Sequence, residues 1–66
     1  MKKITYPIEN PYYINIIITR FNQSKNGSEW ETAKFCNLIM GENSIIIEYP
    51  DEIALFHAAL LLGKFI

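Results

Sequence analysis

The C-terminal run over residues 53–66 constrains the fold most, because eleven of its fourteen residues are apolar and helix signals lie at both of its ends. Pro50-Asp51-Glu52 comes before it and places two carboxylates where a helix N-terminus leaves N–H groups unpaired. Gly63 followed by Lys64 is typical of a C-terminal end, where glycine can take a left-handed conformation and a cation lies near the last carbonyls. The pattern predicts a helix over 51–63.

This helix would be apolar on all sides, and its two sides differ in bulk. At 3.6 residues per turn, the bulky side carries Ile53, Phe56, His57, Leu60 and Leu61. The small side carries Ala54, Leu55, Ala58, Ala59 and Leu62. We expect the bulky side to pack on a sheet. A helix that is apolar all round is normally buried, and a 66-residue chain has few elements to cover both sides. We therefore predict a homodimer formed through the small side.

The residues before this helix predict β structure. Residues 12–21 are rich in β-branched and aromatic side chains, which is typical of a strand, and Asn26-Gly27 is a strong hairpin signal. In residues 44–49 successive side chains would point to opposite faces, with Ile45, Ile47 and Tyr49 opposite Ile46 and Glu48, and this segment predicts another strand. Two prolines make residues 1–11 an extended arm, with a short edge strand at 4–8.

Residues 28–40 allow two interpretations. Alternation over 30–40 predicts a strand that would pair with 12–21. Ser28 followed by Glu31 forms a capping box, which would instead begin a helix. The preceding Asn-Gly turn favours the strand, but the sequence leaves both structures open.

These elements predict one α+β domain over 1–66. An extended arm (1–11) would lead into a three-stranded antiparallel β-meander (12–49), and the C-terminal helix (51–63) would pack across it. The arm could add a fourth, short edge strand. At this size a core rarely supplies more than about 3–5 kcal/mol, so small domains commonly add staples or partners. The one cysteine, Cys36, cannot form an internal disulfide, which leaves association as the remaining means of stabilisation.

Composition excludes several function classes. The net charge is −1 and the six basic residues are scattered, so no basic stripe for a nucleic-acid backbone can be recognised. We find no secretory signal, and the longest apolar segment is shorter than the roughly 20 residues needed to span a bilayer. The chain is therefore expected to be cytoplasmic. Abundant isoleucine, asparagine, lysine, tyrosine and phenylalanine, all with A/T-rich codons, favour an origin in a low-GC bacterium or its phage.

No residue pattern points to catalysis. His57 is the only histidine and is expected to be a core or interface residue bonded to a backbone carbonyl. Cys36 could act as a nucleophile with His57 as its base, but the sequence does not place the two together, and a buried hydrophobic role suits it better. No metal-ligand spacing and no phosphate-binding loop is present. We predict no catalytic residue, no metal and no cofactor.

The remaining interpretation is a non-catalytic interaction module, a phage or mobile-element accessory protein that binds and inhibits or modulates a larger host complex such as a defence system. The predicted partner-binding residues combine one row of the expected first strand with its neighbours, Tyr13, Asn15, Ile17, Thr19, Trp30 and Glu48. The alternative is a small module that binds single-stranded nucleic acid on an aromatic sheet face. That face would carry Tyr12, Tyr13, Phe21, Trp30 and Phe35.

Overall fold

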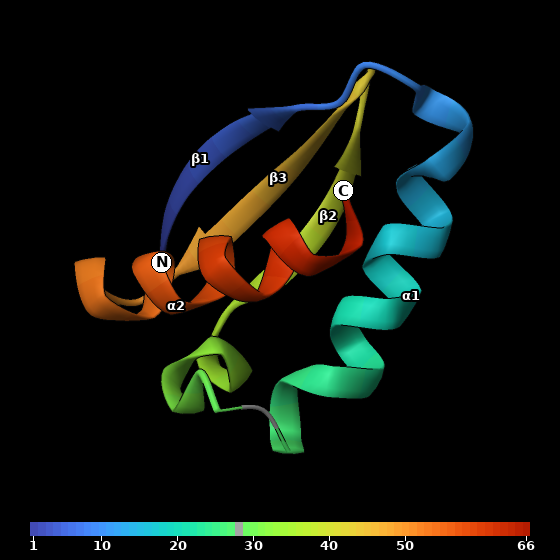
Figure 1. Ribbon diagram of the computed structural model, residues 1–66. Coiled ribbons are helices and arrows are strands. Elements are labelled where there is room, and N and C mark those ends of the chain that lie inside the picture. Colours follow the sequence, from blue (N-terminus) through green and yellow to red (C-terminus); the bar gives the residue numbers. More distant parts are fainter. Residues whose placement is uncertain (28) are drawn as a thin grey trace.

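The chain forms a three-stranded antiparallel sheet with a helix across one face and a second helix beside it (Figure 1). The computed structural model describes residues 1–27 and 29–66. The principal elements are β1 (Lys2–Pro7), α1 (Ile14–Ser24), β2 (Asn37–Gly41), β3 (Ser44–Tyr49) and α2 (Glu52–Leu62). Four short 3-10 turns join or extend them: η1 (Pro11–Tyr13), η2 (Lys25–Gly27), η3 (Glu31–Phe35) and η4 (Gly63–Phe65).

Strand β3 is central, in the order β1-β3-β2, and pairs antiparallel with both neighbours. Ile45, Ile47 and Tyr49 of β3 are buried and belong to the same core as residues of both helices. The alternate residues of β3 point to the opposite face, which no described element covers. Because β1 and β2 both run antiparallel to β3, they are parallel to each other, and α1 makes the crossover between them.

The predicted fold, a meander with a single C-terminal helix, is wrong, because residues 14–24 form the helix α1. Helical spacing places Ile14, Ile17 and Phe21 in the core, with 2%, 3% and 0% of their surfaces exposed. The turn η1, which leads directly into α1, is capped: the Asn10 side chain accepts a hydrogen bond from the backbone N–H of Tyr12 at 3.1 Å. Pro11, which was expected to end an extended arm, occupies the first position of η1, where proline is favoured.

Of the other local predictions, two strands are confirmed and the hairpin is wrong. The strand over 44–49 is confirmed as β3, and the edge strand in the N-terminal arm is confirmed as β1, with bounds of Lys2–Pro7. No hairpin forms at Asn26-Gly27, since this segment lies in η2. The ambiguous segment divides between η3 and β2, while Ser28 of the proposed capping box lies outside the described residues. The turn that does join two strands, β2 to β3, contains Asn43 in a left-handed conformation with φ of 50°.

The predicted start of the C-terminal helix is confirmed. The Asp51 side chain accepts a hydrogen bond from the backbone N–H of Ala54 at 2.8 Å and so caps α2. The expected left-handed end is wrong, because Gly63 has a φ of −58° and the chain continues into η4.

The orientation predicted for α2 is also wrong. The inward face comes mainly from the small side: Ala54, Ala58 and Leu62 are at most 1% exposed, and Leu61 is the buried residue of the bulky side. Ile53 and Phe56 of the bulky side are 64% and 63% exposed. Large isoleucine and tyrosine side chains already fill the sheet face, so alanines let the helix backbone approach it closely. Of the residues predicted to form the dimer interface, Ala54, Ala58 and Leu62 are therefore committed to the chain's own core. Leu55 and Ala59 are half-buried.

Candidate functional site

The structure separates the residues predicted to bind a partner. Tyr13 is exposed at the end of η1, and Asn15 and Thr19 are exposed on α1. Ile17 is buried, because a helix turns neighbouring positions of a strand row to different sides. Trp30 lies against α2, with its ring 6.0 Å from that of His57. Glu48 points to the uncovered face of the sheet and pairs with Lys3 at 3.8 Å. These six residues do not form one surface.

A different set does gather around the start of α1, and we call it the tyrosine surface: Tyr12, Tyr13, Ile16, Arg20 and Met40. Tyr12 is 88% exposed, Tyr13 54% and Ile16 49%. Tyr12, Ile16 and Arg20 follow one another at intervals of four and so lie along one side of the helical segment. Met40 is 51% exposed and lies on the core side of β2, the strand that α1 packs against.

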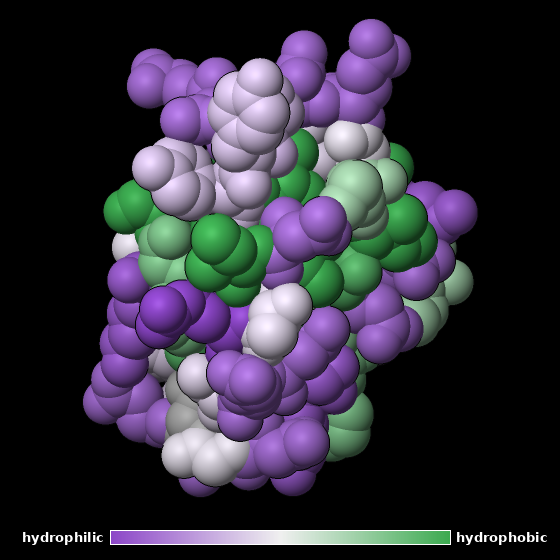
Figure 2. All heavy atoms as spheres, turned by 90° about the vertical axis from the view of Figure 1, so that its right-hand side faces the viewer, coloured by the Kyte–Doolittle hydropathy of each residue, from purple (hydrophilic) through white to green (hydrophobic). Residues whose placement is uncertain are grey.

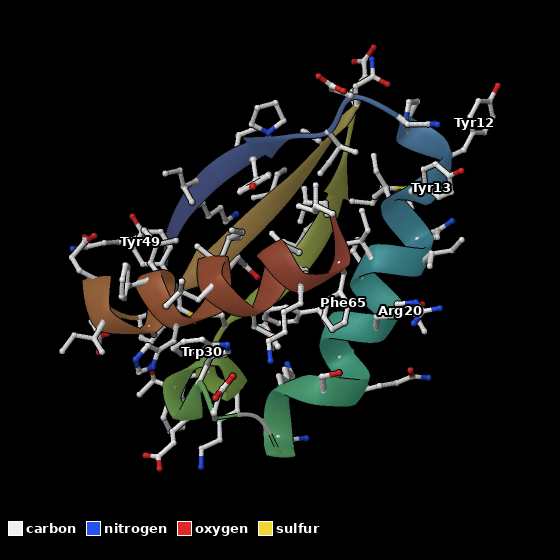
Figure 3. All side chains as sticks on the ribbon, viewed as in Figure 1. Tyr12, Tyr13, Arg20, Trp30, Tyr49 and Phe65 are labelled. Atoms are coloured by element: carbon white, nitrogen blue, oxygen red, sulfur yellow. The ribbon has the colours of Figure 1, made fainter. Side chains whose placement is uncertain are left out.

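The figures show the setting of this surface. In Figure 2 apolar atoms cross the middle of the face that carries α1, between hydrophilic margins above and below. In Figure 3 the side chains of Tyr12 and Tyr13 point away from the sheet, as does Arg20 further along the helix. A shallow depression of about 410 Å³, lined by Asn15, Ile16, Thr19, Arg20 and Gln23, continues the surface along α1. Exposed tyrosine, methionine and arginine beside apolar area are typical of protein interfaces.

His57 has a structural partner. Its Nδ1 lies 2.6 Å from the hydroxyl oxygen of Thr32, and the backbone N–H of Thr32 points to the same nitrogen at 3.4 Å. The histidine therefore accepts from the first turn of η3, rather than bonding to a carbonyl as we expected. This contact joins η3 to α2. It also engages Nδ1 of His57 with Thr32, so this nitrogen is not available to act as a base for Cys36.

Cys36 is fully buried, and its Sγ donates to the backbone carbonyl of Ala54 at 3.3 Å. Burial raises the pKa of the Cys36 thiol above its ordinary value; the nearby Lys25 ammonium acts in the opposite direction, and the Asp51 carboxylate adds to the increase. A buried thiol with a raised pKa is a weak nucleophile, so the geometry favours the hydrophobic role predicted for this cysteine.

The raised thiol pKa predicts a specific alkaline instability. Above about pH 9 the unfolded chain loses the Cys36 proton before the folded chain does, so the free energy of unfolding should fall as the pH rises. Urea unfolding at pH 8 and pH 10, under reducing conditions, measures this fall. The Cys36→Ala variant should show a smaller fall, since the lysines and tyrosines titrate in both proteins. An equal fall in both would contradict the assignment to Cys36.

The structure does not assemble the other chemical sites that we considered. Within residues 1–27 and 29–66, no group of three or more His, Cys, Asp or Glu side chains is placed to hold a metal ion. The aromatic set of the nucleic-acid alternative is dispersed: Phe21 is buried, Tyr12 lies at the start of α1, and Phe35 lies on η3 under the Lys34 ammonium. The described strands place no aromatic side chain on the uncovered face of the sheet.

No protein-family model, curated protein or solved structure matches the chain. In the part of the chain that the structure describes, none of the helices combines the length and the apolar character needed to cross a bilayer.

Sequence reasoning named Tyr12 only for the nucleic-acid alternative, and it missed Ile16 and Met40 as members of the exposed surface. A signal for Tyr12 and Ile16 on one side was present, because Tyr12, Ile16 and Arg20 recur every four residues, as on one side of a helix. Met40 had no such signal, since its exposure depends on where α1 lies against β2.

Proposed function

We propose that this chain is a non-catalytic interaction module that binds a larger protein through the tyrosine surface. The observation that carries the proposal is the presence of Tyr12, Tyr13 and Ile16, each about half exposed or more, next to one another in the capped turn η1 and the first turn of α1. Rigid aromatic side chains on an ordered helix lose little conformational entropy when they bind, which suits them to anchor an interface.

The chemistry of the surface indicates the kind of partner. Its aromatic and aliphatic area would fit an apolar hollow on a folded protein, and Arg20 beside it would pair with a carboxylate at the rim. The same proposal includes three finer parts: a partner in a host complex such as a defence system, a cytoplasmic location, and a phage or mobile-element origin. Small size and composition support these finer parts.

The test compares protein capture by tagged variants. Affinity purification from the organism that encodes the chain, with quantitative mass spectrometry, should identify proteins that the wild-type chain enriches. The Tyr12→Ala/Ile16→Ala variant should reduce that enrichment at least tenfold, which corresponds to about 1.4 kcal/mol of binding free energy. Both side chains are largely exposed, so the variant should still fold.

The matched control changes an exposed polar side chain of the same helix that lies outside the depression, Asn22→Ala, and should leave capture unchanged. Equal capture by the tyrosine-surface variant and the wild type would contradict the proposal. The nucleic-acid alternative has a separate readout: a gel shift with a single-stranded oligonucleotide that weakens steeply as salt is added and is lost in the Tyr12→Ala/Ile16→Ala variant. That result would replace the protein-binding proposal.

A further inference from the structure

The outward side of α2 carries an apolar stripe with no cover from the described chain. We call Ile53, Phe56 and Leu60, which are 64%, 63% and 37% exposed, the outer stripe. In Figure 1 α2 lies in front of the sheet, and no described element lies in front of α2. The stripe continues at Gly63, so the four positions are spaced by three, four and three residues, the repeat of a coiled-coil seam.

We propose that a second copy of this chain packs on the outer stripe, with the two α2 helices antiparallel and related by a two-fold axis that crosses the stripe at the level of residue 58. This proposal is independent of the tyrosine surface, which lies on α1. The positions of the stripe are symmetric about residue 58: Phe56 then faces the partner's Leu60, and Ile53 faces the partner's Gly63. Each layer combines a larger with a smaller residue, which is how packed helices interdigitate.

Charges at the two ends of α2 favour the antiparallel orientation. At one end Lys2 pairs with Glu52 at 3.6 Å, and at the other Lys64 pairs with Glu29 at 3.1 Å. An antiparallel pair brings Glu52 level with the partner's Lys64, while the two Glu52 side chains stay about 18 Å apart along the axis, at 1.5 Å per residue. A parallel pair would bring Glu52 beside the partner's Glu52. The antiparallel pair also aligns the two helix dipoles favourably.

The size of the stripe predicts a weak dimer. A standard interface buries about 800 Å² per partner, which is a large share of the 4341 Å² surface of this chain. Helix α2 has 11 residues and is therefore about 16 Å long, so its contact falls at the small end of the range. We expect a dissociation constant on the order of micromolar.

The first experiment is sedimentation velocity on the purified full chain from about 1 μM to 1 mM, around the expected dissociation constant. The mass should rise from 7.7 kDa towards twice that value. The Phe56→Glu variant places a charge in the stripe and should stay monomeric over the same range, with an unchanged circular dichroism spectrum. The control variant Ile16→Glu changes a comparably exposed apolar residue of α1 and should dimerise like the wild type.

The second experiment tests the orientation with a short bismaleimide cross-linker in a Cys36→Ala background. An equimolar mixture of Ile53→Cys and Gly63→Cys chains should cross-link, because these two positions share a layer. Ile53→Cys chains alone should not, since the two cysteines would lie about 15 Å apart along the axis. A wild-type chain that remains monomeric at 1 mM, or a Phe56→Glu variant that dimerises like the wild type, would overturn the proposal. If the wild-type chain stays monomeric, a different protein rather than a second copy would cover the stripe. Cross-linking of Ile53→Cys chains alone would overturn the antiparallel arrangement.

Discussion

Replacing Ile17 with alanine is expected to lower the free energy of unfolding by about 2–5 kcal/mol, because the side chain is 3% exposed and leaves a cavity in the core. The same replacement at the neighbouring Ile16 should cost less than about 1 kcal/mol, since Ile16 is 49% exposed and alanine favours a helix. The two variants lose the same atoms one residue apart. Their difference therefore measures which side of α1 faces the core.

Urea denaturation followed by circular dichroism gives both values from the same experiment. The comparison is sharp because an extended segment over 12–21 would reverse it. As a strand, the row containing Ile16 would face the core and the row containing Ile17 would be half exposed. A larger loss for Ile16→Ala than for Ile17→Ala would therefore contradict the helix α1 in the described register.

The misassigned segment shows where sequence reasoning failed. The density of β-branched residues in 12–21 favoured a strand, but this preference is weak and tertiary packing overrides it. The spacing of Ile14, Ile17, Ile18 and Phe21 matched a helical face equally well, and Asn10-Pro11 supplied a start signal. In this segment the spacing of the apolar residues predicts the structure better than the residue composition does, and a helix in place of a strand changes the topology of the sheet.

The features predicted correctly depend on neighbouring residues. The cap of α2 needs only Asp51 and the N–H groups that follow it, and β3 needs only the alternation of its own side chains. The orientation of α2 does not depend on neighbouring residues alone, because it is set by how much space the side chains of the sheet leave for the helix. Either side of an all-apolar helix can face inward, so the sequence of the helix alone could not decide between them.

The sequence predicted the candidate surfaces only in part, as it did the fold. Tyr13 was chosen for its residue type and is exposed, but its expected neighbours were taken from a strand row and the helix separates them. Helix α2 does have a second apolar side without cover from the described chain, and that side carries Ile53 and Phe56. The contact between Thr32 and His57 joins residues 25 positions apart, so no local sequence pattern predicts it.

The largest effect is expected for Ala58→Glu, which should leave little folded protein. Ala58 is fully buried between α2 and the sheet, so glutamate there must place a carboxylate among apolar core side chains or push the helix away. The cost of several kcal/mol exceeds the roughly 3–5 kcal/mol that a core of this size supplies. Circular dichroism should show a loss of cooperative thermal unfolding.

The Leu60→Glu variant is the matched control, because it adds the same charge two residues later on α2. Leu60 is 37% exposed on the outer stripe, so the carboxylate can reach water and the chain should fold. The two variants thus separate the inward from the outward side of one helix. If Ala58→Glu folds while Leu60→Glu does not, the bulky side of α2 packs on the sheet after all, and the outer stripe does not exist as a free surface.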